Sequence, residues 1–396
     1  MRKRATRVAS LKLGVLCLLA LAPLELALAA PPNTKSVSFP VPLAADSDLS
    51  VTKLPSSYPR GWAFVAYAND KFELLDVGSD QREVKGQLPG HESATALIAT
   101  RRPEIYVADT VWSRGNRGDR TDYLTVYSKE TLLPLGEVVL PGAKRALVVP
   151  MQGMLSFADD ERLALVFNFT PASSVTVVDL EKRKVLDEVP IPGCSLAYST
   201  GPRGFSSFCS GGTLLSVQLD EKGQVKNRHE TAAFNNLDAD PLFTASAAFE
   251  GIRYFPSFHG HLQPLDLSAA EPKVLPAWSL VSAGEERDNW RPSGLQLISA
   301  GDDGHLYVLM QPDGHEGSHK EPGTEVWVFD TKTHSRLSRI RLVRPGTSIE
   351  VTHDQVPLLL VATNDQLDVY GLPYGNLVRS LDAQARRGGV LMEAMK

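Results

Sequence analysis

Seven short stretches of this chain end in the same way, with an alternating or apolar run closed by a turn residue. Successive ends lie 41 to 64 residues apart, the spacing of strand-rich repeats that form the blades of a β-propeller. The seven stretches are Phe72–Asp76, Leu124–Ser128, Val175–Asp179, Leu214–Asp220, Leu262–Asp266, Val326–Asp330 and Leu367–Gly371. The repeat therefore predicts an all-β fold, a seven-bladed β-propeller over residues 30–396. Function in such a rigid ring usually lies on its faces and loops.

Further strand-like runs surround these stretches, because they have strand length and are rich in β-branched or aromatic residues. They are Trp62–Tyr67, Glu83–Leu88, Glu104–Ala108, Gly136–Pro141, Leu163–Phe167 and Lys184–Pro190. The longest interval holds an expected helical turn at Ser282–Asp288 and a polar insertion at Gln311–Gly323. We expect a strand at Ser36–Leu43 to close the ring by joining the last blade. The tail from Ala383 is expected to be loose.

The first 29 residues have the features of a secretory signal peptide. Five basic residues precede an uncharged apolar run at Leu13–Ala22, and small residues stand at Ala27 and Ala29. Cleavage is therefore expected between Ala29 and Ala30. An uncleaved anchor is the alternative, but the run is shorter than the roughly 20 residues of a membrane span. A lipoprotein site at Cys17 is disfavoured because bulky Val15 and Leu16 precede it.

Removal of residues 1–29 leaves 36 Lys and Arg against 45 Asp and Glu. The mature chain is acidic and carries no basic stripe. This composition argues against binding to nucleic acid or to an anionic membrane surface.

Cys194 and Cys209 are the two cysteines of the expected mature chain. In an exported protein, two cysteines 15 residues apart predict a disulfide. Turn residues at Gly201–Gly204 separate them, which places the two cysteines near the ends of paired strands. A metal site would need further ligands, and none lies near them in the sequence.

His315–His319 matches the HExxH pattern of zinc proteases. That chemistry requires a helix, because the two histidines must share one helix face. Pro312, Gly314, Gly317, Pro322 and Gly323 surround the motif, so a loop is favoured over a helix and no metal is expected.

Two other motifs have plain structural explanations. Arg117–Asp119 is an adhesion-like tripeptide, but neighbouring arginines and acids, including Asp122, can stabilise the loop by pairing among themselves. His259 and His261 are candidate ligands, yet alternation along a strand explains them equally well. The chain contains no nucleophile elbow, phosphate-binding loop or dinucleotide fingerprint. No catalytic residue is assigned to this chain.

Several longer segments resemble the heavy chain of the quinone-dependent amine dehydrogenases. These segments are Tyr106–Asp122, Asn289–Gln296, Leu306–Met310, Pro312–Lys320 and Glu325–Lys332, together with the Cys194 and Cys209 pair. The insertion around His315 is more similar to the aralkylamine branch than to the methylamine branch.

The resemblance implies a periplasmic assembly of two heavy and two light chains, in which this chain is the non-catalytic heavy subunit. The light chain of the family carries tryptophan tryptophylquinone and the catalytic base. Primary amines are oxidised to aldehyde and ammonia, and the electrons pass to a small blue-copper protein.

The family has an aromatic residue just before the Gly-His of its first inter-blade loop, lining the substrate channel. Leu88 replaces that aromatic residue here, and Gly90 and His91 follow it. The resemblance implies that these three residues wall the channel, whereas Leu88 is alternatively a blade-packing leucine. The C-terminal tail around Arg386 and Arg387 departs from the family.

Two other functional classes compete with the heavy-subunit interpretation. A stand-alone periplasmic propeller that binds or scaffolds other molecules is the first. An independent hydrolase or metalloenzyme is the second, and it depends only on the HExxH match.

Overall fold

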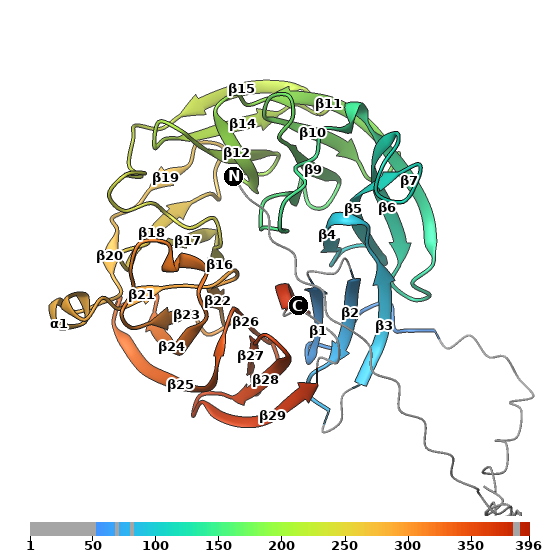
Figure 1. The fold of residues 1–396 in the computed structure, drawn as a ribbon. Helices are drawn as coiled ribbons and strands as arrows, with labels where there is room; N and C mark the ends of the chain where they lie inside the picture. The colour runs from blue at the N-terminus through green and yellow to red at the C-terminus, as the bar shows by residue number, and fades with distance from the viewer. Residues whose placement is uncertain (1–52, 68–70, 80–82, 383–388) are drawn as a thin grey trace, which may run out of the picture. The chain divides into compact units, whose positions relative to one another are not determined.

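The computed structural model describes residues 53–67, 71–79, 83–382 and 389–396. Over these residues the chain forms seven antiparallel sheets that surround a common axis, confirming the predicted seven-bladed β-propeller (Figure 1). The predicted signal peptide, its cleavage site at Ala29 and Ala30, and the Ser36–Leu43 segment lie outside the described residues. None of the described helices is long and apolar enough to cross a membrane.

The first four blades follow one pattern, in which successive strands run outward from the axis (Figure 1). The first blade contains β30 (Gly389–Ala394), β1 (Trp62–Tyr67), β2 (Lys71–Asp76) and β3 (Glu83–Pro89). The second contains β4 (Glu92–Ile98), β5 (Glu104–Trp112), β6 (Arg120–Ser128) and β7 (Pro134–Leu140), and is followed by the short 3-10 helix η1 (Pro141–Ala143). The third contains β8 (Leu155–Ala158), β9 (Leu163–Asn168), β10 (Ser174–Asp179) and β11 (Lys184–Pro190). The fourth contains β12 (Cys194–Ser199), β13 (Gly204–Cys209), β14 (Leu214–Leu219) and β15 (Val225–Glu230).

The fifth and sixth blades each have one strand broken into two short pieces. The fifth contains β16 (Ala247–Phe249), β17 (Ile252–Pro256), β18 (His261–Asp266) and an outer edge made of β19 (Lys273–Val274) and β20 (Trp278–Ser279). The sixth contains β21 (Arg291–Pro292) and β22 (Ile298–Ala300), then β23 (His305–Gln311), β24 (Gly323–Asp330) and β25 (Arg336–Gly346), with the 3-10 helix η2 (Ser318–Lys320) before β24. The seventh contains β26 (Ser348–Val351), β27 (Leu358–Ala362), β28 (Gln366–Gly371) and β29 (Asn376–Asp382).

All seven repeated stretches lie in the third strand of a blade, counted from the axis. These strands are largely buried because neighbouring blades cover both of their faces, which explains their strong apolar signal. The long interval before β24 contains the expected helical turn, α1 (Ala283–Arg287). Its capping box is complete, because Ser282 and Glu285 each accept a hydrogen bond from the other's backbone N–H.

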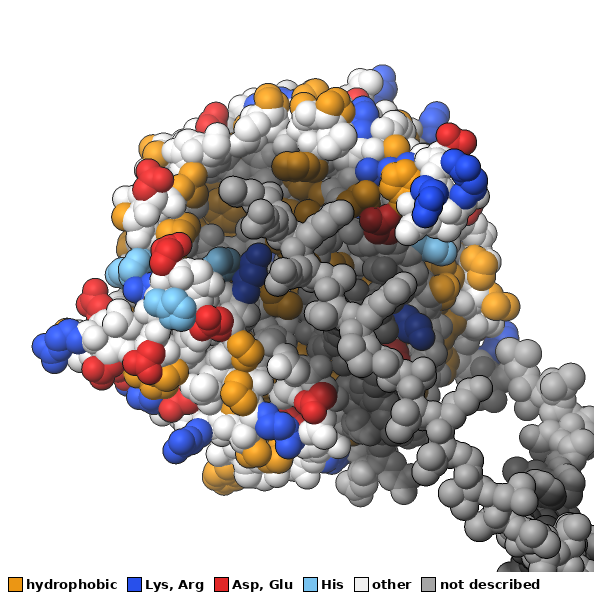
Figure 2. Space-filling model, viewed as in Figure 1, with side chains coloured by type: hydrophobic (Ala, Val, Ile, Leu, Met, Phe, Trp, Pro, Cys, Tyr) orange, Lys and Arg blue, Asp and Glu red, His pale blue; other side chains and the backbone are white. Residues whose placement is uncertain are grey.

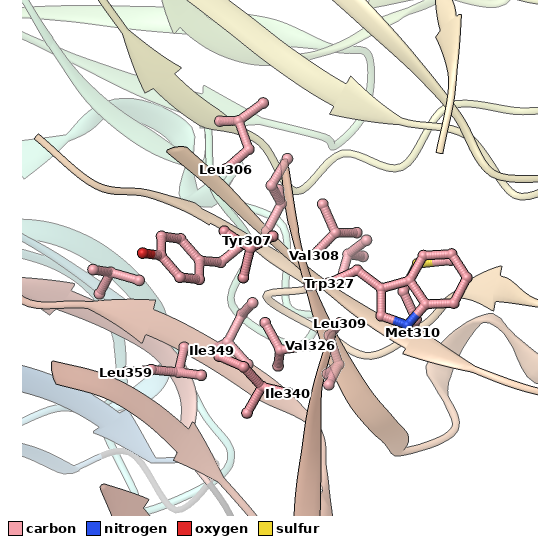
Figure 3. Close-up of a cluster of buried hydrophobic side chains, with 14 of the residues drawn as sticks. Leu306, Tyr307, Val308, Leu309, Met310, Val326, Trp327, Ile340, Ile349 and Leu359 are labelled. Carbon is pink, nitrogen blue, oxygen red and sulfur yellow. The ribbon is translucent and has the colours of Figure 1, made fainter. Parts of the chain in front are cut away.

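The hydrophobic core consists of layers between adjacent blades. In the largest cluster, side chains of β23 and β24 pack against those of β25, β26 and β27 (Figure 3). Trp327 and Val326 of β24 are completely buried there, as is Leu359 of β27. Each blade is therefore held mainly by its two neighbours.

Among the described residues, the C-terminal strand β30 closes the ring in the first blade. β30 pairs with β1 in the first blade, with Met392 opposite Val65, while the last blade takes all four of its strands from residues 348–382. The expectation of a loose tail is thus wrong for residues 389–394. Leu, Met, Glu and Ala favour helices when isolated, so only pairing with β1 makes this segment a strand.

Candidate functional site on the upper face

Three of the sequence motifs and the Gly90–His91 turn lie at the same end of the propeller. Strands alternate in direction within a blade, so the loops between second and third strands share one face with the loops between blades. We call this the upper face. It carries Gly90–His91 between β3 and β4, Arg117–Asp119 between β5 and β6, His259 between β17 and β18, and His315–His319 between β23 and β24. Figure 2 shows several histidine side chains gathered over the fifth and sixth blades.

A cavity of about 520 Å³ opens among these loops, and we call it the upper-face cavity. Its charged or strongly polar lining residues are Gln152, Asp238, His259, Glu316, His319 and Lys320. Its apolar wall is formed by Phe258 and Leu391 together with the apolar residues of the segments 149–151, 237–245 and 294–295. The cavity therefore combines a hydrophobic floor with a few charged or titratable side chains at its rim, as ligand and protein-binding sites do.

Hydrogen bonds from Asp240 hold the loop between β17 and β18 in place. Its carboxylate accepts from the Ser257 hydroxyl at 2.8 Å and from the His259 backbone N–H at 2.7 Å, and it contacts the His261 ring at 2.8 Å. His259 lies in the turn and His261 begins β18, so strand alternation explains only one of the two histidines. The partner residue Asp240 comes from the long connection between β15 and β16, which carries no sequence motif.

The HExxH segment is a loop, as predicted. Gly317 has a left-handed φ of 89°, and only Ser318–Lys320 form one turn of 3-10 helix. His315 is exposed and lies 3.6 Å from Glu321. The described residues contain no group of three or more His, Cys, Asp or Glu side chains arranged to hold a metal ion.

This segment is part of the wall of the upper-face cavity. The His319 carbonyl accepts a hydrogen bond from Gly294 N–H at 3.0 Å, and the Ser318 carbonyl accepts one from the Gln311 amide at 2.9 Å. The Phe258 ring makes an edge contact with the His319 ring, and the guanidinium of Arg291 lies 4.5 Å from the centre of the Phe258 ring. The insertion therefore packs on the fifth-blade loop, a contact that no local pattern in the sequence indicates.

Leu88 and His91 occupy different environments. Leu88 in β3 is 2% exposed, stands opposite Phe72 and belongs to the core cluster between the first two blades. This burial supports the packing alternative for Leu88. His91 is exposed on the upper face, and its Nδ1 lies 2.7 Å from buried Asp109. A channel role for Gly90 and His91 stays a prediction.

The Arg117–Asp119 loop is stabilised by its own groups and by the strands beside it. Ser113 Oγ accepts from Asp119 N–H at 2.9 Å, and Arg120 donates to buried Asp122 at 3.0 Å. The predicted pairing of an arginine with Asp122 is thus confirmed. Asp122 also accepts from the backbone of Arg145 at 2.8 Å, which ties this loop to the next inter-blade connection.

The predicted disulfide is present between Cys194 and Cys209. The two residues face each other at the paired ends of β12 and β13, with Cα atoms 3.9 Å apart. Their backbone N–H groups bond elsewhere, to Ile191 and Thr213, so the cysteines form a non-hydrogen-bonded pair whose side chains approach closely.

Solved structures with a similar fold share little sequence with this chain. A dihydro-heme d1 dehydrogenase NirN has a TM-score of 0.53 at 16% identity, covering 86% of this chain and 78% of that chain. A putative 6-phosphogluconolactonase from Bacteroides fragilis has a TM-score of 0.56 at 10% identity, covering 88% of this chain and 99% of that chain. At such identities the similarity concerns the fold alone.

Sequence comparison is more specific. The chain is 26% identical over 300 residues to the methylamine dehydrogenase heavy chain of Methylorubrum extorquens, covering 76% of this chain and 73% of the relative. It is 31% identical over 285 residues to that of Paracoccus versutus, covering 70% of this chain and 66% of the relative. The family model described as methylamine dehydrogenase heavy chain (MADH) matches residues 71–393, which contain strands of every blade and leave out β1 of the first. The chain therefore belongs to the methylamine dehydrogenase heavy chain family.

Proposed function

We propose that this chain is the non-catalytic heavy subunit of a periplasmic, quinone-dependent amine dehydrogenase. The observation that carries the proposal is the family match over residues 71–393. In this assembly a light chain supplies tryptophan tryptophylquinone, a primary amine is converted to aldehyde and ammonia, and a small blue-copper protein accepts the electrons. Two heavy and two light chains form the complex.

The tryptophans of this chain do not fit a quinone cofactor of their own. Trp290 and Trp327 are the only pair of tryptophans among the ring contacts of the described residues, with centroids 5.1 Å apart. Trp327 is 0% exposed, and the guanidinium groups of Arg336 and Arg339 lie 4.3 Å and 4.6 Å from its ring centre. An amine cannot reach a ring that is covered in this way. This supports a cofactor on the partner subunit.

We further propose that the light chain docks on the upper face. Gly90 and His91, which the family resemblance assigns to the channel, lie there, and the upper-face cavity opens there with an apolar wall. Interfaces commonly have such an apolar centre with a charged rim. This chain then binds the light chain and lines part of the channel through which the amine reaches the quinone.

The first test is a search beside the gene of this chain for a cysteine-rich light chain with two quinone-forming tryptophans, followed by co-expression of the two chains. A tag on this chain should recover both subunits in equal amounts, and the complex should reduce a dye only when a primary amine is added. Comparison of phenylethylamine with methylamine distinguishes the aralkylamine branch, which the insertion around His315 resembles more, from the methylamine branch. Recovery of this chain alone from cells that make both subunits would favour the stand-alone propeller, the alternative function.

Two charge-reversal variants test the docking face. Lys320 lies at the rim of the upper-face cavity, and Lys332 lies in the β24–β25 loop at the opposite end of the same blade. Both side chains are exposed, so neither change should affect folding. Lys320→Glu should reduce recovery of the light chain, whereas Lys332→Glu should leave it unchanged. Equal recovery with both variants argues against docking on the upper face.

The periplasmic location has its own test. The basic and apolar character of residues 1–29 supports export, and a disulfide is typical of oxidising compartments. Cell fractionation should find the mature chain in the periplasm, with Ala30 as its first residue. A cytoplasmic protein that keeps Met1 contradicts this part of the proposal.

A further inference from the structure

A second cavity of about 420 Å³ lies on the propeller axis, and we call it the axial cavity. The strand nearest the axis contributes lining residues in every blade, for example Thr95 in β4, Ser156 in β8 and Met392 in β30. It is distinct from the upper-face cavity, although Met151, Gln152 and Leu391 line both. Most of its titratable lining groups belong to the fifth, seventh and first blades.

Arg253 brings a positive charge to this cavity without a carboxylate beside it. It lies on β17, and one of its nitrogens donates to Ser246 Oγ at 3.0 Å. Its guanidinium is 5.6 Å from the centre of the Tyr198 ring. Among the described residues, no Asp or Glu oxygen lies within 4.0 Å of it. Burial lowers the pKa of Arg253, as expected for a cation taken from water without an ion-pair partner.

The other charged groups that line the cavity do not neutralise Arg253. Glu350 and Glu393 both interact with Lys396, at the end of the chain. Glu350 is also held by hydrogen bonds from Gln296 and from Ala394 N–H. His353 contacts Asp302 at 2.7 Å. The cavity therefore has an acidic side at the seventh and first blades and a positive side at the fifth.

A network of hydrogen bonds orients polar groups beside Arg253. The side-chain oxygen of Gln152 (Oε1) accepts hydrogen bonds from the Ser246 backbone N–H at 2.8 Å and from the Ser246 hydroxyl at 3.2 Å. With its oxygen occupied in this way, the Gln152 amide N–H groups are left to donate elsewhere. Arg253 and Gln152 thus both offer donors, and the serine between them fixes their relative positions.

We propose that the axial cavity binds a small oxyanion, a carboxylate or a phosphate, on the guanidinium of Arg253 with the amide of Gln152 beside it. Arginine binds both groups through paired N–H donors, which makes it the side chain best suited to this chemistry. The site is separate from amine oxidation, and it requires only this chain.

Binding should be measured on the purified mature chain, by calorimetry and by thermal unfolding. Acetate and inorganic phosphate are the probes, each exchanged against chloride at constant ionic strength so that general screening stays the same. Wild-type protein should bind at least one of them and unfold at a higher temperature in its presence. If only acetate or only phosphate binds, that result identifies whether the cavity accepts a carboxylate or a phosphate.

Variants connect the effect to Arg253. Arg253→Gln should raise the dissociation constant at least about tenfold, because it removes the charged donor. Arg114→Gln removes an exposed arginine from the Arg117–Asp119 loop and should bind as wild type does. Arg253→Lys keeps the positive charge but loses the paired N–H donors, so it should fold and bind more weakly. If Arg253→Gln does not fold, Arg253→Lys provides the test.

Two results would overturn the proposal. One is a wild-type protein that shows neither heat of binding nor a shift of the unfolding temperature with either anion. The other is an equal anion effect in wild type and in folded Arg253→Gln, or in Arg253→Lys where only that variant folds. Neither result bears on the heavy-subunit proposal, since no amine and no light chain enters the experiment.

Discussion

Gln296 and Met392 exchange two hydrogen bonds although 96 residues separate them in the chain. Met392 N–H donates to the Gln296 side-chain oxygen at 2.8 Å, and the Gln296 amide donates to the Met392 carbonyl at 3.0 Å. The same amide contacts the carbonyl of Ile349 at 3.1 Å. One buried side chain thus connects the sixth, seventh and first blades where the C-terminal strand closes the ring.

Replacement of Gln296 by leucine should weaken this closure. The change leaves the buried backbone groups of Met392 without their partner, and we expect a loss of about 2–4 kcal/mol in the free energy of unfolding. Chemical denaturation measures it. Gln224→Leu, at an exposed position in the turn before β15, is the matched control and should have little effect. A similar stability in both variants would show that Gln296 does not secure the ring.

Loss of the disulfide should lower stability, since the link restricts the unfolded chain. For a loop of 15 residues the chain-entropy model predicts about 3 kcal/mol. Cys194→Ala combined with Cys209→Ala should therefore unfold at a lower temperature than oxidised wild type. Reductant should lower the unfolding temperature of wild type and leave that of the double variant unchanged. Peptides that carry free thiols in protein from the periplasm would contradict the bond itself.

Glu350 should make stability depend on pH. Burial raises its pKa from 4.5 to about 7, so between these values the folded state binds more protons than the unfolded state. The free energy of unfolding must then fall as pH rises through this window and level off above it. Burial raises the pKa of Glu393 as well, in the same direction.

The Glu350→Gln variant isolates this contribution. Gln296 donates to the Glu350 carboxylate, so the substitution also disturbs a hydrogen bond, and the slope against pH is therefore the useful quantity rather than absolute stability. Denaturation at several pH values between 5 and 8 should give a shallower decline than in wild type. Glu316→Gln, at an exposed position, serves as the control and should keep the wild-type slope. An unchanged slope in Glu350→Gln would mean that the carboxyl is already ionised at pH 5.

Leu88→Ala should act on stability, because the side chain is 2% exposed and packs among core residues of the first two blades. Truncation of such a leucine costs about 2–5 kcal/mol. The ranking of amines by kcat/KM in the assembled enzyme should stay the same. A changed ranking with little loss of stability would instead assign Leu88 to the substrate channel.

Much of the architecture was predictable from local sequence. The third strands, such as Val326–Asp330, are covered on both faces, so their composition alone shows that they are buried strands. The cysteine pair and the helical turn after Ser282 were predictable for the same reason, since turn residues and capping groups act over a few positions. The broken character of His315–His319 followed from its glycines and prolines.

Only the tertiary structure decided how distant segments meet. Residues 389–394 have helix-favouring composition. They become a strand because β1 offers an open edge with which they pair, so the position of β1 in the ring decides their conformation and their own sequence does not. Leu88 could not be assigned from its position in a turn-flanked strand, since burial depends on the neighbouring blade. Arg253 carries no motif at all. Its proposed role depends on the cavity that it lines, which is enclosed by strands from all seven blades. These strands place no carboxylate beside its guanidinium.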